Sequence, residues 1–235
     1  MSAEIEFLNT SAGRLYRLGG KLVSAHVLVD DDGLVLIDAG LLGIADQFGR
    51  LLKAIGRSPD ELRAILLTHG HLDHTGGAAR IQRETGAGLW VHAADREHVE
   101  GRVRYRGWAR GCGFLERAGR ALIGYKSPTV TNELVDGMRL PWWGGLRVVH
   151  LPGHTPGHCG FICERTGWLL SGDLFASYGW SVHLPPRFLN RDQRGVYGSI
   201  VKVAAMNVSG VIPSHYDVLD PSIHRQRLGR LVKGR

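Results

Sequence analysis

Four side chains of the types that bind metal ions lie within six residues, directly after a short apolar run. The run, residues 64–67, is predicted to be a buried strand, and His69, His71, Asp73 and His74 follow it. In an extended turn alternate residues face the same side, so His69 and His71 can point together. Imidazole and carboxylate groups are usual ligands of zinc and iron. Because desolvated imidazoles at a strand end need a compensating partner, we interpret the cluster as a metal site.

The composition excludes several classes of protein. The chain has 235 residues, of which 43% are apolar and 22% charged, which is ordinary for a globular protein and long enough to fold without disulfides. No apolar run approaches the roughly 20 residues that a membrane-spanning helix needs. The first eleven residues include Glu4 and Glu6 and no apolar stretch, so we expect no signal peptide. The cysteines number three, too few for a disulfide framework, which favours a reducing, cytoplasmic setting.

Strands and helices must position the cluster, and we expect residues 1–235 to form a single domain. Strands gather early and in the middle of the chain, with helices in both halves, which predicts an α/β fold of two packed sheets with helices outside. The predicted strands are 15–18, 22–29, 34–37, 64–67, 89–91, 130–134, 147–151, 159–163, 168–170 and 208–212. The predicted helices are 44–55, 77–85, 93–99, 192–206 and 221–231.

The spacing His69-x-His71-x-Asp73-His74 resembles the signature of the metallo-β-lactamase-fold hydrolases. Further motifs follow in that family's order. They are Asp38-Ala39-Gly40 at an early strand end, Gly153-His154-Thr155-Pro156-Gly157-His158, Ser171-Gly172-Asp173-Leu174-Phe175 and Pro213-Ser214-His215. Any one of the later motifs would be weak alone, but together they cover nearly the whole chain and are specific.

The resemblance implies an αββα sandwich of two mixed sheets flanked by helices, with a dinuclear metal centre at one edge. By the family pattern His69, His71 and His154 hold one divalent ion, and Asp73, His74 and His215 hold the other. Asp173 bridges the two ions, and Asp38 steadies the His69–His74 loop by hydrogen bonds. We expect zinc first, with iron or manganese as alternatives. A metal-bridging hydroxide would be the nucleophile, and Asp73 would orient it or carry the released proton.

The residues of the motifs around His154 and Asp173 resemble those of glyoxalase II and the lactone hydrolases more than those of antibiotic-degrading enzymes. We therefore expect a small-molecule ester, thioester or lactone as substrate. Only 20 residues follow His215, too few for the C-terminal helical domain of glyoxalase II, so glutathione thioesters are a weaker expectation. Tyr178 and His183 lie in the segment after Asp173, where substrate contacts are expected; Tyr178 could donate to an oxyanion.

Residues 101–126 hold seven basic side chains and one acid, Glu116, and so carry most of the net charge of +7. The segment has no clear helical period, and we treat it as a basic insertion. It is either a solvated surface or a lid that attracts an anionic substrate. Its interleaved aromatic residues leave open a phosphodiesterase or ribonuclease of the same fold. A third alternative is an iron-containing redox enzyme, because the same ligands accept iron.

Overall fold

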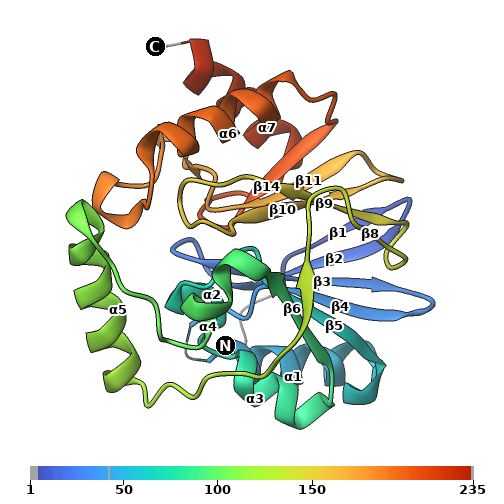
Figure 1. Cartoon of the computed structure of the whole chain (residues 1–235). Coiled ribbons are helices and arrows are strands. Elements are labelled where there is room, and N and C mark those ends of the chain that lie inside the picture. Colours follow the sequence, from blue (N-terminus) through green and yellow to red (C-terminus); the bar gives the residue numbers. More distant parts are fainter. Residues whose placement is uncertain (1–4, 42, 234–235) are drawn as a thin grey trace.

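Two mixed β-sheets lie face to face in the computed structural model, and helices cover their outer faces (Figure 1). The structure describes residues 5–41 and 43–233. The expected α/β sandwich of two mixed sheets with flanking helices is confirmed. The expectation that no signal peptide is present rested partly on residues 1–4, which lie outside the described residues. No helix in the described part of the chain is long and apolar enough to cross a membrane.

The first sheet has its strands in chain order. Its first four strands are antiparallel neighbours, and β4 to β7 then run parallel to one another. The helices α1 (Ile44–Ile55) and α3 (Ala78–Thr85) connect parallel strands and pack on the outer face. The strands are β1 (Phe7–Thr10), β2 (Gly13–Gly19), β3 (Ser24–Asp30), β4 (Gly33–Ile37), β5 (Leu62–Leu66), β6 (Gly88–His92) and β7 (Val130–Leu134).

The second sheet has the order β14-β11-β10-β9-β8, and only β11 and β14 are parallel. Its strands are β8 (Arg139–Leu140), β9 (Leu146–His150), β10 (Cys159–Cys163), β11 (Trp168–Gly172) and β14 (Gly210–Pro213). The helices α6 (Gln193–Ala205) and α7 (Pro221–Lys233) cover its outer face. A small hairpin of β12 (Ala176–Ser177) and β13 (Val182–His183) extends beside this sheet.

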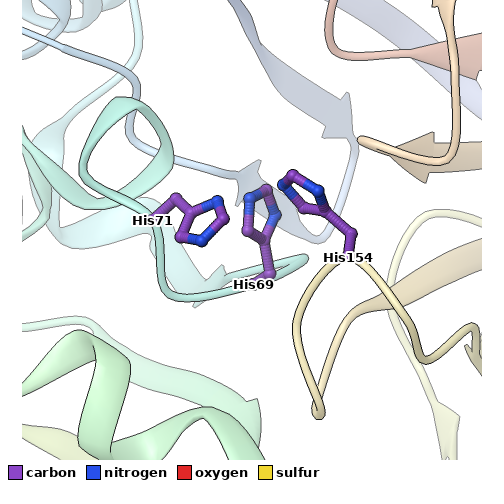
Figure 2. Close-up of side chains that lie close together, drawn as sticks. All are labelled: His69, His71 and His154. Atoms are coloured by element: carbon purple, nitrogen blue, oxygen red, sulfur yellow. The ribbon is translucent and has the colours of Figure 1, made fainter. Parts of the chain in front are cut away.

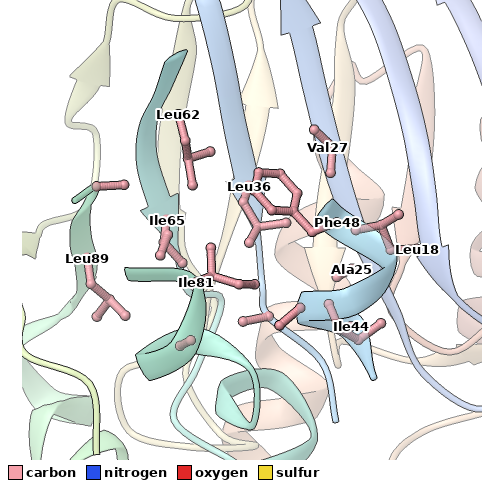
Figure 3. Close-up of a cluster of buried hydrophobic side chains, with 14 of the residues drawn as sticks. Leu18, Ala25, Val27, Leu36, Ile44, Phe48, Leu62, Ile65, Ile81 and Leu89 are labelled. Carbon is pink, nitrogen blue, oxygen red and sulfur yellow. The ribbon is translucent and has the colours of Figure 1, made fainter. Parts of the chain in front are cut away.

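Side chains that alternate along the strands pack into separate hydrophobic cores on the two faces of each sheet. On β4, Leu34 and Leu36 pack under α1 and α3, whereas Val35 and Ile37 pack between the two sheets. Figure 3 shows the outer core, in which Phe48 of α1 lies against Leu36. A third core joins the second sheet to α6 and α7. Each sheet is therefore buried on both faces, as expected for near-continuous apolar strands.

The basic segment contains a helix that its sequence did not predict. Helix α5 (Arg110–Leu122) follows a 3₁₀ turn at Gly107–Ala109 and lies beside the short helices α2 (Leu72–Thr75) and α4 (Arg96–Val99) (Figure 1). The buried side of α5 is formed by Cys112 and Gly113, while Phe114 and Leu115 are exposed. Its apolar residues therefore do not mark its buried face. The other 3₁₀ turns are Pro59–Glu61, Ala93–Asp95 and Arg187–Leu189.

Candidate metal centre

The predicted ligand residues all lie at one edge of the two sheets, on loops and on the short helix α2. The segment from His69 to His74 follows the carboxyl end of β5, and Asp38 follows the adjacent parallel strand β4. Asp173 and His215 follow the parallel strands β11 and β14 of the other sheet. Carboxyl ends of parallel strands meet at one edge of a sheet, and ligands commonly bind there. The topology thus brings together residues that lie far apart in the sequence.

Three of the histidines form one group, which we call the three-histidine group: His69, His71 and His154. Their rings gather within one small region, although His154 comes from the loop between β9 and β10 (Figure 2). The ring centroid of His69 lies 4.8 Å from that of His71 and 4.7 Å from that of His154. All three side chains are buried, and one ligand atom from each lies within 4.8 Å of the others.

The remaining residues form the aspartate–histidine group: Asp73, His74, Asp173 and His215. Asp173 Oδ1 lies 3.2 Å from His74 Nε2, and Asp173 Oδ2 lies 3.1 Å from His215 Nε2. The same Oδ2 atom is 3.5 Å from His154 Nε2 in the three-histidine group. Asp73 Oδ2 is 3.7 Å from the Nε2 atoms of both His74 and His215. Asp173 therefore touches both groups.

Neighbouring groups fix the orientation of the imidazoles through their Nδ1 atoms. His74 Nδ1 lies 2.8 Å from Asp38 Oδ2, and His154 Nδ1 lies 2.8 Å from Asn190 Oδ1. His69 Nδ1 contacts Thr68 Oγ1 at 3.1 Å, and His215 Nδ1 donates to the carbonyl oxygen of Leu22. Such contacts leave the opposite nitrogen, Nε2, to face the centre, which is the usual arrangement around metal-binding histidines.

Asp38 occupies a strained backbone position that its contacts hold in place. Its φ of 59° is left-handed, which costs about 1–3 kcal/mol for a residue other than glycine. Its backbone N–H donates to Leu66 O at 2.9 Å. Its carboxylate accepts from Thr68 N at 2.8 Å and from Thr68 Oγ1 at 2.9 Å as well as contacting His74. Asp38 thus joins the ends of β4 and β5 beneath the histidines.

The two groups differ in charge state. Burial, followed by the neighbouring histidines His74 and His154, holds the pKa of His69 well below its usual value. Burial and then His154 do the same for the pKa of His71. Both rings are therefore neutral near pH 7 and keep a lone pair that a cation can accept.

In the aspartate–histidine group the carboxylates decide the charge. Burial acts to lower the pKa of His74, but Asp173, Asp38 and Asp73 outweigh it and hold that pKa well above the usual value. For His215 burial is likewise outweighed by Asp173, and the pKa rises to about 9. Burial acts to raise the pKa of Asp173, but His215 and His74 hold it well below its usual value. Without a cation, protons on these two rings neutralise the buried carboxylate.

Buried polar atoms without hydrogen-bond partners converge on the centre. Among the described residues they include His69 Nε2, His74 Nε2, His154 Nε2 and Asp173 Oδ1. Leaving such atoms unpaired in the interior costs about 1–3 kcal/mol each. Their close approach without hydrogen-bond geometry is the arrangement expected of ligands that share a cation. The donor set of imidazoles and carboxylates suits zinc, iron and manganese, so the residues fit the divalent metals that the fold implies.

Sequence reasoning missed Asp95, a fully buried carboxylate that ties two site loops together. Its Oδ2 accepts from Gly70 N at 2.9 Å and from Thr155 Oγ1 at 2.6 Å. Its Oδ1 accepts from Gly157 N at 2.6 Å. Gly70 lies between His69 and His71, whereas Thr155 and Gly157 follow His154, so Asp95 connects the two loops that carry these histidines. An aspartate near the start of a helix is ordinary, and no local signal distinguished this one.

Residues near the centre from α5 and the 187–191 loop were also missed. Glu116 accepts a hydrogen bond from Leu72 N at 2.9 Å, at the start of α2. Cys112 lies buried in α5, and its Sγ is 3.7 Å from His71 Nε2. Burial, with Glu116 adding to it, raises the pKa of Cys112 to about 12, so the thiol is neutral. Asn190, whose Oδ1 contacts His154 Nδ1, was not singled out in the sequence.

A cavity of about 650 Å³ opens beside the aspartate–histidine group. Tyr178 and His183, which the sequence analysis proposed as substrate contacts, both line it together with Asp173 and His215. The Tyr178 hydroxyl donates to Lys21 O at 2.7 Å, so its proton is already engaged. The other lining residues are Lys21, Leu22, Phe175, Ala176, Trp180, Pro185, Pro186, Leu189 and Asp217.

Known proteins resemble the chain in sequence. A family model described as the metallo-beta-lactamase superfamily matches residues 18–215. The probable metallo-hydrolase YybB of Bacillus subtilis is 31% identical over 170 residues, which cover 72% of this chain and 70% of YybB. The hydroxyacylglutathione hydrolase GloC of Haemophilus influenzae is 31% identical over 158 residues, which cover 64% of this chain and 65% of GloC.

Solved structures resemble the chain in fold. TTHA1623, solved in a di-iron-bound form, is 27% identical with a TM-score of 0.67 and covers 89% of this chain and 94% of its own. A metallo-beta-lactamase of Cronobacter sakazakii with a HARLDQ motif has a TM-score of 0.70 at 22% identity, covering 94% and 89% of the two chains. With the family model spanning most of its length, the chain belongs to the metallo-beta-lactamase superfamily, whose members are generally hydrolases.

Proposed function

We propose that the protein is a hydrolase with a dinuclear metal centre that cleaves an ester, a thioester or a lactone. The three-histidine group would hold one divalent ion. Asp73, His74 and His215 would hold the second, with Asp173 as a ligand of both. His71 would bind through Nδ1, because its Nε2 contacts Cys112 Sγ at 3.7 Å. The position of Asp173, within 3.5 Å of Nε2 atoms from both groups, is the observation that carries the proposal.

Two bound cations would supply a water molecule of lowered pKa and polarise the scissile carbonyl. Residues of the chain would accept the released proton and hold the proposed ligands in place. Asp73 is the least buried of the proposed ligands, with a side chain 32% exposed, so one of its oxygens can accept the proton that the attacking water loses. Asp38 and Asn190 hold His74 and His154 in one orientation and prevent the rings from turning away.

The cavity beside the centre supports an acyl substrate with an apolar portion. Its lining includes the apolar side chains of Phe175, Trp180, Pro185 and Leu189 as well as Asp173 and His215 of the proposed metal centre. Its volume suits a small molecule rather than a polymer. Relatives named hydroxyacylglutathione hydrolases act, by that name, on an acyl group carried on glutathione, which favours the thioester or oxygen-ester class over phosphodiesters.

The test is a substrate panel with the metal-loaded full chain. It includes lactones, simple esters, acyl thioesters, phosphodiesters and β-lactams. We expect turnover of at least one of the first three classes, and loss of that turnover in Asp73→Ala and in His71→Ala. Turnover of phosphodiesters alone would overturn the proposal in favour of a nuclease, and activity that survives both substitutions would overturn the mechanism.

Metal identity is proposed separately, with zinc first and iron as the competing ion. TTHA1623 was solved with two irons, and imidazole and carboxylate ligands accept both metals. Elemental content of freshly purified protein is expected to give two zinc ions per chain. A coloured protein with two iron ions that consumes oxygen or peroxide would favour the redox alternative instead.

A further inference from the structure

A second cavity, which we call the arginine pocket, lies outside the proposed metal centre. It has a volume of about 470 Å³, and four arginines line it: Arg102, Arg104, Arg106 and Arg191. The remaining lining residues are Ala94, Glu97, His98, Val103 and Pro156, none of which lines the cavity beside Asp173 and His215. Neither the proposed hydrolysis nor its ligand set uses this pocket.

An alternating sequence places three of the arginines on one face. Residues 102–106 form neither helix nor strand, and Val103 and Tyr105 are half-buried while the arginines between them are exposed. The Tyr105 ring packs edge-on against His98, with 5.7 Å between the ring centroids, and lies against Gly113 of α5. The inward side chains anchor the segment, so Arg104 and Arg106 point outward by the two-residue period of extended chain.

Arg191 completes the pocket from a different part of the chain. Its Nη1 donates to the carbonyl oxygen of Arg104 at 3.3 Å, which holds the two segments together. Its backbone N–H donates to His154 O at 2.9 Å. The pocket is therefore built on the loop that carries His154, but it faces the 102–106 segment rather than the substrate cavity.

The positive charge of the pocket is largely uncompensated within the part of the chain that the structure describes. Arg102 pairs with Glu100, but no ion pair involves Arg104, Arg106 or Arg191 there. Glu97 is the single acidic residue among those that line the cavity. Like charges held close together repel one another unless an anion lies between them. Guanidinium groups bind phosphate with paired hydrogen bonds in fixed geometry.

A buried, unpaired histidine nitrogen provides a second and independent observation. His98 lines the pocket but is only 3% exposed. Its Nδ1 has no hydrogen-bond partner and lies 3.8 Å from Asp95 Oδ1, beyond hydrogen-bond distance. Buried polar atoms are nearly always paired. The wall of the pocket therefore includes a histidine with an unpaired nitrogen, besides guanidinium groups that pair with no carboxylate among the described residues.

We propose that the arginine pocket binds a phosphate-bearing small molecule, at a site separate from the metal centre. Arg104, Arg106 and Arg191 would contact the phosphoryl oxygens, and the rest of the cavity would hold an organic portion. The volume exceeds that needed for inorganic phosphate and lies within the range of small-molecule sites. This inference does not depend on which substrate the metal centre hydrolyses.

The test measures binding of inorganic phosphate and of AMP to the full chain by calorimetry, at about 0.15 M salt. Adenosine serves as the uncharged control. We expect saturable binding of AMP with a Kd below about 1 mM and at least tenfold weaker binding in the double variant Arg104→Gln/Arg106→Gln. Arg110→Gln/Arg117→Gln is the matched control, because it removes two exposed arginines of the same segment that line no part of the pocket.

Each contrary outcome would overturn the proposal. Equal weakening in both double variants would show general attraction to the basic segment rather than a site. Binding that disappears in chelator-treated protein or in Asp173→Asn, but survives in Arg104→Gln/Arg106→Gln, would place the anion at the metal centre. Binding of an RNA oligonucleotide without binding of phosphate or AMP would indicate a nucleic-acid surface. Unchanged melting temperatures of the variants check that the exposed substitutions leave the fold intact.

Discussion

The three-histidine group and the aspartate–histidine group share one carboxylate but are held in different ways. The three-histidine group is buried, and two of its rings, His69 and His71, are neutral because burial lowers their pKa values. The aspartate–histidine group carries charges of both signs that pair with each other at 3.1–3.2 Å around Asp173. Without a cation the second group is held by these opposite charges, although His74 Nε2 and Asp173 Oδ1 make no hydrogen bond. His69 and His71 of the first group are neutral and have no such attraction.

Burial and charge therefore act on different parts of one centre. Burial dominates in the three-histidine group, and paired charges dominate in the aspartate–histidine group. In the three-histidine group His69 and His71 are neutral, and the geometry is fixed by Asn190 at His154 and by Asp95 between the loops. In the aspartate–histidine group, Asp173 and His215 line the 650 Å³ cavity, and the Asp73 side chain is 32% exposed. A bound cation would therefore stabilise the three-histidine group chiefly by supplying a partner for its lone pairs. It would stabilise the aspartate–histidine group by replacing the protons on His74 and His215.

Metal removal is expected to have the largest effect and to act unevenly on the two groups. A ligand present at about 1,000 times its Kd stabilises the fold by about 4 kcal/mol, so chelation should lower the melting temperature by roughly 8–16 °C. Hydrogen exchange should increase more in residues 69–71 and 153–155 than in residues 173 and 215. Equal increases in both groups would contradict the comparison.

Substitution of the shared carboxylate should disable both groups together. Asp173→Asn removes the charge that lies beside His74, His154 and His215. We expect metal content to fall at both positions and kcat/KM to fall by more than the roughly 10–100-fold typical of residues that only touch a ligand. His71→Ala is the matched variant, expected to remove one metal only. If Asp173→Asn retains two metals per chain, the bridging position is wrong.

Asn190→Ala separates the groups more finely. It removes the 2.8 Å contact between Asn190 Oδ1 and His154 Nδ1 and leaves the aspartate–histidine group untouched. Metal affinity at the three-histidine group should fall by roughly 10–100-fold, as measured by competition with a chelator, while the other ion keeps its affinity. Asn9→Ala, on the exposed edge strand β1, is the control and should change neither affinity.

The residues proposed as ligands could be found in the sequence, because four of the seven lie in one motif of fixed spacing after an apolar run and the other three lie in short motifs farther along the chain. The supporting residues could not. Asp95 lies in a segment that reads as an ordinary helix start, and its three donors come from residues 70, 155 and 157. Such a role depends on tertiary neighbours that no local period encodes.

Helix α5 was missed for a related physical reason. Its buried side carries Cys112, Gly113, Glu116 and Arg120, which are small or polar, while its large apolar residues face outward. Polar contacts replace apolar burial here: Glu116 accepts from Leu72 N, and Arg120 donates to Gly70 O at 3.2 Å. A search for apolar periodicity finds helices that pack on a core, and α5 packs instead on the loop that carries His71.

The smallest effect is expected from a substitution in the wall of the cavity beside the aspartate–histidine group. Tyr178 lines that cavity, and removing a donor that stabilises an oxyanion usually lowers kcat by about 10²–10³-fold. Because the Tyr178 hydroxyl donates to Lys21 O at 2.7 Å, Tyr178→Phe should instead lower kcat by less than about tenfold, the cost of one ordinary hydrogen bond. A loss of about 10²-fold in kcat with unchanged KM would show that the hydroxyl turns toward the substrate. Tyr178, in the wall of the cavity, would then act in catalysis together with Asp73 and Asp173.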